Sequence, residues 1–171
     1  MKYLLFAVMM VWGVNCFGQV KVYTTIDNIT GDTAIETKQY PLVVEHYSKK
    51  DSVVSYSASA SMYKIRGNKN FSLTISFNVS DAISLSEGGS GYIKISTGDI
   101  IQLRRIGGFK IYTKDDDIFY TLDITEAIDK LKNVEITDIR LTTDNGDRNI
   151  SLQDHKTVVS QLIATLLTLN F

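Results

Sequence analysis

The stretch FSLTISFNV, residues Phe71–Val79, decides the fold class, because its side chains alternate strictly between apolar and polar. A period of two residues is that of a β-strand with one face on a core and the other face toward water. The sequence therefore predicts a strand that leaves Ser76 exposed on its outer face. The side chains predicted to face the core are Phe71, Leu73, Ile75, Phe77 and Val79.

The segment before it, SVVSYSASASMY (Ser52–Tyr63), repeats the alternation, with serines on the outer side. Its inner side carries Ala58 and Ala60, whose small size indicates that another element packs closely there. Val20 to Ile26 and Pro41 to Tyr47 are further predicted strands. The polar residues 28–39 between them are predicted to form a loop.

Two hairpins are expected next. In the first, a three-residue loop at Thr97–Asp99 would place Ile95 opposite Ile101 and keep the apolar residues on one face. In the second, Phe109–Thr113 would pair with Ile118–Leu122, so that Ile111 lies opposite Tyr120. Thr137 to Thr143 follows as a strand with Ile139 and Leu141 inward.

The hydrophobic period then changes to that of a helix in two places. Asp123, with Glu126 three residues later, resembles a capping box and predicts a short helix near 124–132. From Asp154, a predicted N-cap, apolar residues recur at helical spacing and predict a C-terminal helix packed on the sheet. The apolar members of this second pattern are Val158, Val159, Leu162, Ile163, Leu166 and Leu167.

Together these segments predict an α+β fold that is mostly antiparallel β, a sandwich or a curved sheet. We expect six to eight strands, a short helix near 124–132 and a C-terminal helix on the sheet. With a single proline, Pro41, and no low-complexity tract, residues 19–171 are predicted to form one β-rich globular domain.

Residues 1–18 have the layout of a secretory signal peptide: a positive start, an apolar run over Tyr3–Val14, and small residues Cys16 and Gly18 before a cut at Gln19. The run is about a dozen residues, shorter than the roughly 20 that span a bilayer, so we expect no membrane insertion. The signal predicts an exported protein that is periplasmic, at the cell surface or secreted. A second interpretation makes Cys16 the lipidated cysteine of a lipoprotein, although Asn15 replaces the small residue usual before it.

Composition excludes some partners and stabilising devices. A net charge of −1 and a pI near 6.1, with no basic stripe, lack the electrostatic footprint of nucleic-acid binding. Cleavage at Gln19 would remove Cys16, the one cysteine, so the exported chain would rely on its hydrophobic core rather than on disulfides.

Four features could carry chemistry, and each is interpreted as structural. Asp115-Asp116-Asp117 and Asp144-Asn145-Gly146-Asp147 lack the converging oxygens of a calcium site and are predicted turns. Glu87–Gly91 is glycine-rich but leads into a strand rather than into the helix that a phosphate loop needs. His46 and His155 have no ligand or triad partner at a recognisable spacing. We therefore assign no catalytic, metal or cofactor residue and expect no cofactor.

Two short motifs, Asp32-Thr33-Ala34 and Asp51-Ser52-Val53, resemble the Asp-Ser/Thr-aliphatic sites of Bacteroidota O-glycosylation and nominate Thr33 and Ser52. The Phe17-Gly18-Gln19 cut and the run TLDITEAIDKLKNVEITDIRLTTDNG (residues 121–146) also resemble small exported Bacteroidota proteins of unknown function. This resemblance covers about a quarter of the chain, and it implies export but no activity and no site residue.

The leading functional hypothesis is a soluble extracytoplasmic binding or interaction module, with an unknown protein or glycan as its partner. Frequent tyrosines would suit either partner, although tyrosine is also an ordinary strand residue. Two alternatives stay open. One is a small eight-stranded outer-membrane β-barrel, although the segments with helical spacing interrupt the succession of strands. The other is a small secreted hydrolase whose active site is assembled from residues distant in the sequence.

Overall fold

The structure is a computed structural model that describes residues 20–26, 31–47, 52–78, 83–113 and 116–169, with the backbone alone at 44–47 and 52–54. It confirms the predicted class: mostly antiparallel β-sheet with a short helix and a C-terminal helix. The elements are β1 (Val22–Ile26), β2 (Thr33–Thr37), β3 (Tyr40–Tyr47), β4 (Ser52–Ile65), β5 (Asn68–Asn78), β6 (Ile83–Leu85), β7 (Ser90–Ile95), β8 (Ile100–Ile106), β9 (Lys110–Tyr112), β10 (Asp117–Asp123), the 3-10 turn η1 (Thr125–Ala127), α1 (Ile128–Leu131), β11 (Ile136–Leu141), β12 (Arg148–Ser151) and α2 (Val158–Thr168).

The two long strands predicted first, β4 and β5, form the centre of the sheet. They pair antiparallel, so that Ala58 lies opposite Ile75 and Ala60 opposite Leu73. All four side chains are fully buried, as the alternation predicted. The inner face of this pair is the floor of the hydrophobic core.

The outer face of the pair differs from the prediction. Ser76 is 8% exposed rather than open to water, and Ser59, Ser61 and Ser72 are at least as deeply buried. Short serine side chains lie low between the neighbouring strands. The prediction of an exposed Ser76 was therefore wrong, because exposure on a sheet face depends on neighbours across the strands as well as on alternation.

The edge of β4 opposite β5 is shared by two strands. β2 pairs with Ser61–Lys64 and β3 pairs with Ser52–Ala58 of the same strand. β2 falls inside the segment 28–39 that was predicted to be a loop. Its five residues, TAIET, are too few for a periodic pattern, and only Ile35 is a large apolar residue.

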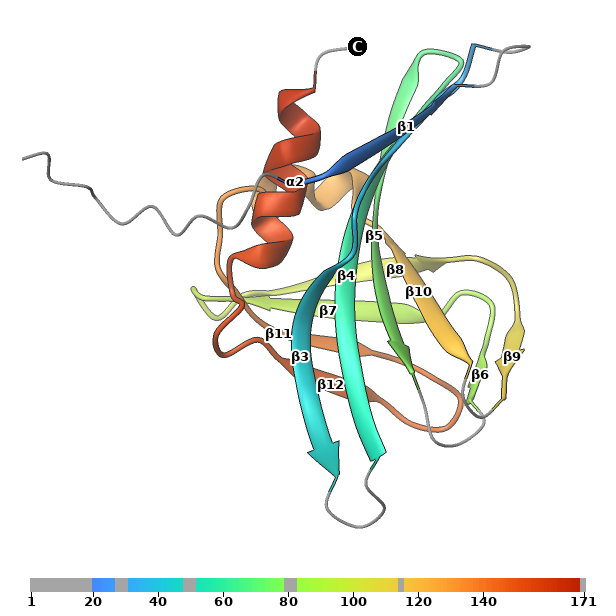
Figure 1. Ribbon diagram of the computed structural model, residues 1–171, viewed down its shortest axis with the longest axis vertical. Helices are drawn as coiled ribbons and strands as arrows, with labels where there is room; N and C mark the ends of the chain where they lie inside the picture. The colour runs from blue at the N-terminus through green and yellow to red at the C-terminus, as the bar shows by residue number, and fades with distance from the viewer. Residues whose placement is uncertain (1–19, 27–30, 48–51, 79–82, 114–115, 170–171) are drawn as a thin grey trace, which may run out of the picture.

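The C-terminal helix α2 packs on β4 and β2, on the side of the sheet seen at the left of Figure 1. The small inner residues Ala58 and Ala60 leave room for it, as predicted. Its buried residues include five of the six that were predicted to face the core, whereas Leu167 is 38% exposed. The N-cap is Thr157 rather than Asp154, which lies in the turn before the helix.

The first predicted hairpin is present as β7 and β8, with a different register. Ile93, rather than Ile95, lies opposite Ile101. The loop is longer than predicted, since the Ile95 N–H donates to the Asp99 carbonyl at 3.0 Å. The register shift is two residues, so each side chain keeps its predicted face.

The prediction of the second hairpin was wrong. β9 pairs with β6, placing Ile111 opposite Ser84. β10 pairs instead with β5, so that Tyr120 lies opposite Ile75. This register places the apolar face of β10 beside the apolar face of β5, and both faces are buried in the core.

The main sheet has the strand order β1-β2-β4-β5-β10-β8-β7-β11-β12 and is not closed. β10 and β8 are joined only by Thr121 with Ile106 and Leu122 with Arg105. At this short joint the sheet changes direction, and Figure 1 shows β7, β8, β11 and β12 running across β3, β4 and β5. The curved sheet thus folds over its own core.

The described residues form twelve strands, more than the six to eight predicted, because the short strands β2, β6 and β12, of three to five residues, were not predicted. The predicted helix near 124–132 is present as η1 and α1, with Ile124 and Leu131 fully buried. The Asp123 carboxylate accepts the Thr125 N–H at 3.1 Å, while no side chain caps η1 at Ile124.

Candidate functional site

Two segments singled out in the sequence, the glycine-rich loop at 87–91 and the turn at 144–147, lie in one polar cluster. Hydroxyls just before the glycine-rich loop hold the turn. Ser84 donates to one Asp144 carboxylate oxygen at 2.8 Å, and Ser86 donates to the other. These bonds keep the pKa of Asp144 below its ordinary value, Ser86 contributing most. The carboxylate is therefore occupied in holding loops together.

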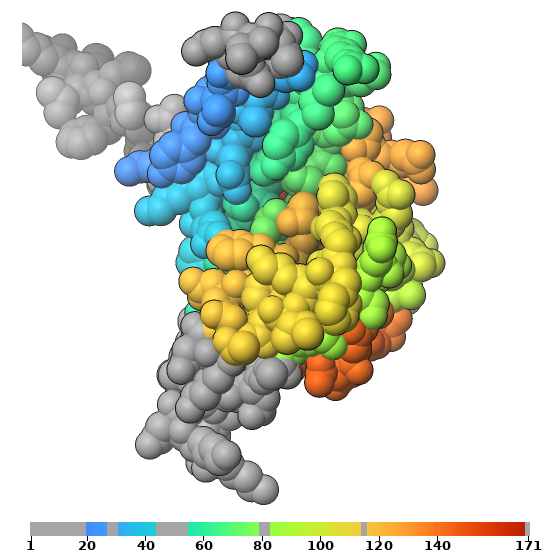
Figure 2. All heavy atoms as spheres, turned by 90° about the vertical axis from the view of Figure 1, so that its right-hand side faces the viewer, coloured from blue at the N-terminus to red at the C-terminus, as the bar shows by residue number. Residues whose placement is uncertain are grey.

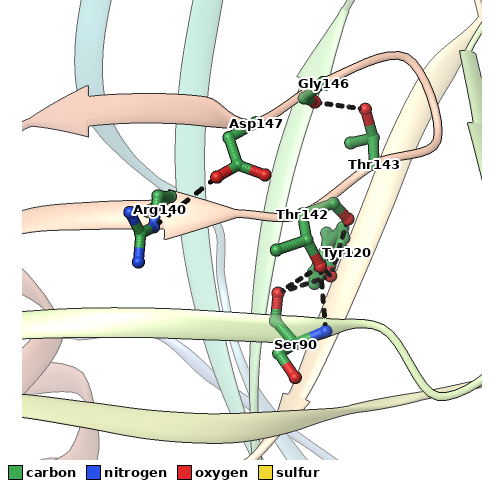
Figure 3. Close-up of polar contacts among 7 residues, drawn as sticks. All are labelled: Ser90, Tyr120, Arg140, Thr142, Thr143, Gly146 and Asp147. Carbon is green, nitrogen blue, oxygen red and sulfur yellow. Dashed lines mark hydrogen bonds and ion pairs between the residues drawn. The ribbon is translucent and has the colours of Figure 1, made fainter.

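Beneath this contact, Tyr120 of β10 reaches the ends of β7 and β11 (Figure 3). Its hydroxyl oxygen lies 2.9 Å from the Ser90 carbonyl oxygen and 3.0 Å from that of Thr142. The Thr142 hydroxyl in turn donates to the Ser90 carbonyl at 2.8 Å and accepts the Ser90 N–H at 2.9 Å. Burial raises the pKa of Tyr120, so its phenol remains protonated and serves as a fixed donor.

Arg105 is the one buried charged side chain among the described residues, at 6% exposed. Its guanidinium lies over the Tyr120 ring, with Cζ 5.7 Å from the ring centroid. It donates to three main-chain carbonyls that lie in two loops, those of Ser86 at 2.8 Å, Gly107 at 3.3 Å and Gly108 at 3.0 Å. Nε is buried and has no hydrogen-bond partner. Arg105 thus connects the two loops through hydrogen bonds.

Close packing explains two glycines of the 87–91 loop. A Cβ on Gly89 would lie 3.1 Å from the Tyr120 hydroxyl, and one on Gly91 would lie 2.6 Å from a methyl of Leu122. Both positions need glycine because buried side chains of β10 approach the main chain closely. This supports the structural interpretation of the loop.

The predicted turn at 144–147 is also explained by its own bonds (Figure 3). The Thr143 hydroxyl donates to the Gly146 carbonyl at 2.6 Å, and Gly146 has a φ of 111°. Asn145, in the same turn, does not have positive φ. Asp147 pairs with Arg140 of β11 at 3.7 Å.

In the acidic run at 115–117, Asp116 forms a turn with Thr113. Asp116 accepts the Thr113 N–H at 2.7 Å and the Thr113 hydroxyl at 2.9 Å, which lowers the pKa of Asp116. Asp117 opens β10, and Asp115 lies outside the described residues.

Among the described residues, the histidine and carboxylate side chains form no arrangement with a recognisable chemistry. His155 is half-buried in the turn before α2, and the side chain of His46 lies outside the described residues. Within the described ranges, no three His, Cys, Asp or Glu side chains are grouped as metal ligands would be. Nor does any helix in those ranges have the length and apolarity needed to cross a membrane.

The residues nominated for glycosylation lie at strand ends. Thr33 is half-buried at the start of β2, and Ser52 begins β4, where only the backbone is described. The predicted signal peptide, with Cys16, lies outside the described residues. These assignments stay predictions.

An exposed apolar patch, formed by residues of β8, β9 and β10 and of the loop before β9, was not predicted from the sequence. Four large side chains, 45–62% exposed, form what we call the apolar patch: Ile106, Phe109, Ile111 and Phe119. Ile106 lies opposite Thr121, so Phe119, two residues earlier on β10, is its diagonal neighbour on the same face. Figure 2 shows β8 and β9 (yellow) beside β10 (orange) on one side of the molecule. In the sequence these residues have the same alternation as core residues.

Next to the apolar patch, the outer face of β4, β5 and β10 carries hydroxyls that bond to one another. Ser76, the cross-strand neighbour of Phe119, lies 2.6 Å from the Ser57 hydroxyl. Thr74 and Thr121 likewise lie 3.0 Å apart, oxygen to oxygen. These groups are engaged with each other rather than directed at a ligand.

Two hollows complete the described surface features. A groove of about 1110 Å³ lies between β1, the 38–41 segment and the end of α2. A smaller cleft of about 610 Å³ lies between β8 and η1–α1, and Arg104 and Asp123 pair in it at 3.6 Å. Neither hollow is lined by His155.

Comparison with known proteins adds no relative. No protein-family model matches the chain, and no curated protein or solved structure is significantly similar to it. The resemblance to small exported Bacteroidota proteins therefore stays a prediction, and the function has to be argued from the geometry.

Proposed function

We propose that this chain is an exported interaction module that binds a protein partner through the apolar patch. The observation that carries the proposal is the exposure of four large apolar side chains within residues 106–119, Phe109 at 62%, Ile111 at 61%, Phe119 at 46% and Ile106 at 45%. Large apolar side chains that are exposed together on one side of a protein mark interaction sites.

The energetics favour covering the apolar patch. Fully burying one such side chain contributes roughly 1.5–3 kcal/mol, so burying the exposed half of each contributes about 1 kcal/mol. Aromatic residues with a well-packed centre are also the usual anchors of protein interfaces.

A protein partner fits this surface better than a glycan. Sugars need polar groups to meet their hydroxyls, whereas Phe109, Ile111 and Phe119 offer none. The hydroxyls closest to the apolar patch, such as those of Ser76 and Thr121, already bond to their neighbours. Of the two partner classes that the sequence left open, the protein is therefore the one we propose.

Export is part of the same proposal and rests on the Met1–Gly18 signal. The exported chain is expected to begin at Gln19. It should show no tryptophan fluorescence, since Trp12 is the one tryptophan and lies in the signal. An intact mass that includes residues 1–18 would contradict the export step.

The binding step is tested with a Phe109→Ser/Phe119→Ser double variant and a matched control, Ile100→Ser. Ile100 is 63% exposed but lies at the opposite end of β8, about 20 Å from Ile106 at the rise of a strand. The three proteins are used to retain partners from the extracytoplasmic fraction, and the retained protein is then purified and titrated calorimetrically.

Wild type and Ile100→Ser should bind the purified partner with similar Kd, and the double variant at least 10-fold more weakly, as loss of two anchors implies. Equal affinity for all three proteins would contradict the proposal, because binding would then not use the apolar patch. A retained partner identical to the chain itself would identify a homodimer.

A further inference from the structure

The groove beside α2 has an apolar floor that continues into the core. Val20 and Val22 at the start of the described chain, Tyr40 on β3 and Leu169 after α2 are half-buried and pack against the core. Its volume of about 1110 Å³ is enough for a small ligand, since such sites run from roughly 300 to 1,000 Å³.

The walls of the groove are fixed by hydrogen bonds of the main chain. The Lys38 N–H donates to the Lys21 carbonyl at 2.8 Å, and the Lys21 N–H donates to the Tyr40 hydroxyl oxygen at 3.0 Å. Because Tyr40 accepts in this contact, its own hydroxyl hydrogen remains able to donate. The lysine side chains take no part in these bonds.

The charges lining the groove have one dominant sign. Among the described residues, Lys21 and Lys38 line it, and no Asp or Glu does. The end of α2 contributes the opposite sign, but a helix C-terminus is equivalent to only about half a negative charge. Over the described part of the chain, two full positive charges therefore outweigh it.

From the apolar floor, the two lysines and the Tyr40 donor, we propose that the groove binds an amphipathic carboxylate, a linear aliphatic chain with one anionic end. The aliphatic chain lies along Val20, Val22 and Leu169, and the carboxylate meets Lys21, Lys38 and the Tyr40 hydroxyl. This site is separate from the apolar patch and does not depend on the proposed function.

The test titrates the purified chain with linear carboxylates of six to twelve carbons, each below its micellar concentration, by calorimetry. Alkyl alcohols and alkyl trimethylammonium ions of equal length serve as neutral and cationic probes. Lys21→Gln/Lys38→Gln removes the two charges, and Lys69→Gln/Lys94→Gln removes two exposed charges elsewhere, as a control of equal net charge.

Carboxylate affinity should rise by up to about 4-fold per added methylene, the effect of burying one CH₂. The groove double variant should weaken carboxylate binding about 2- to 30-fold, the range for two exposed ion pairs, and leave alcohol binding unchanged. The control variant should bind like wild type.

Three results would each overturn the proposal. They are the absence of carboxylate binding at every chain length, equal affinity for the trimethylammonium probes, and an equal loss of affinity in the control variant. None of these bears on partner binding at Phe109 and Phe119, so the two proposals can fail separately.

Discussion

Replacing Gly91 with Ala tests the close approach of β10 to the main chain of β7. The added Cβ would lie 2.6, 2.7 and 3.2 Å from Leu122 Cδ2, Cδ1 and Cγ, well inside ordinary contact distances of 3.4–4 Å. Leu122 is fully buried, so the surrounding core restricts its movement.

Overpacking of this kind costs about 1–3 kcal/mol. Alanine also lowers the entropy of the unfolded chain, which offsets about 0.4–1 kcal/mol because Gly91 does not have positive φ. The free energy of unfolding of Gly91→Ala should therefore fall by about 1–2 kcal/mol, a clear fraction of the 5–15 kcal/mol typical of a domain.

The assay is urea unfolding followed by far-ultraviolet circular dichroism, with two companion variants. Gly108→Ala is the matched control, because its Cβ would meet nothing within 4 Å, and its stability should stay level or rise slightly. Leu122→Ala removes the clashing atoms, at a cost of about 2–5 kcal/mol by itself.

In the Leu122→Ala background, Gly91→Ala should be neutral or stabilising, because the new methyl enters the space left behind. The reasoning is refuted if Gly91→Ala costs the same in both backgrounds, or if it behaves like Gly108→Ala in the wild type.

Three further predictions concern the polar cluster and the central strands. Arg105→Met should lower the free energy of unfolding by about 3–5 kcal/mol, because three main-chain carbonyls lose a charged donor; a loss below 1 kcal/mol in urea unfolding would show that the loops hold without it. The pKa of Asp144 is lowered in the folded state, so its contribution is present above the unfolded value near 3.9 and is lost as pH falls through the folded pKa. The stability difference between wild type and Asp144→Asn should thus be constant above about pH 5 and shrink below about pH 4; a difference that grows on acidification would reverse the sign we assign. Phe77→Ala should cost about 3–5 kcal/mol and Ser76→Ala about 1 kcal/mol, since the serine bond to a neighbouring hydroxyl is lost; equal costs would mean that the two strand faces are misassigned.

Sequence periodicity predicted the long elements and missed the short or non-local ones. β4, β5 and α2 have eleven to fourteen residues each, enough for the period to be read. β10 was placed in a local hairpin, whereas it pairs with β5, 45 positions away at Tyr120 and Ile75. Alternation shows which face a residue takes but does not show which strand it pairs with.

The candidate sites were less accessible to prediction for the same reason. The turns at Asp116 and Asp144 were expected, but the contact between Asp144 and Ser84, 60 positions apart, arises only from the fold. Phe109 and Ile111 alternate as core residues do, and their exposure follows from the pairing of β9 with β6. Nothing in the local pattern distinguishes them from buried neighbours.

The most direct test of the proposed function is photocrosslinking in the living cells that produce the protein. A benzophenone amino acid in place of Ile111, one of the four residues of the apolar patch, is compared with the same amino acid in place of Ile100, which is comparably exposed at 63%. The account predicts one discrete protein adduct from position 111, its loss when Phe119→Ser is added, and no such adduct from position 100. A position-111 chain that forms no adduct, or one whose adduct persists with Phe119→Ser, would contradict the claim that this surface binds a protein.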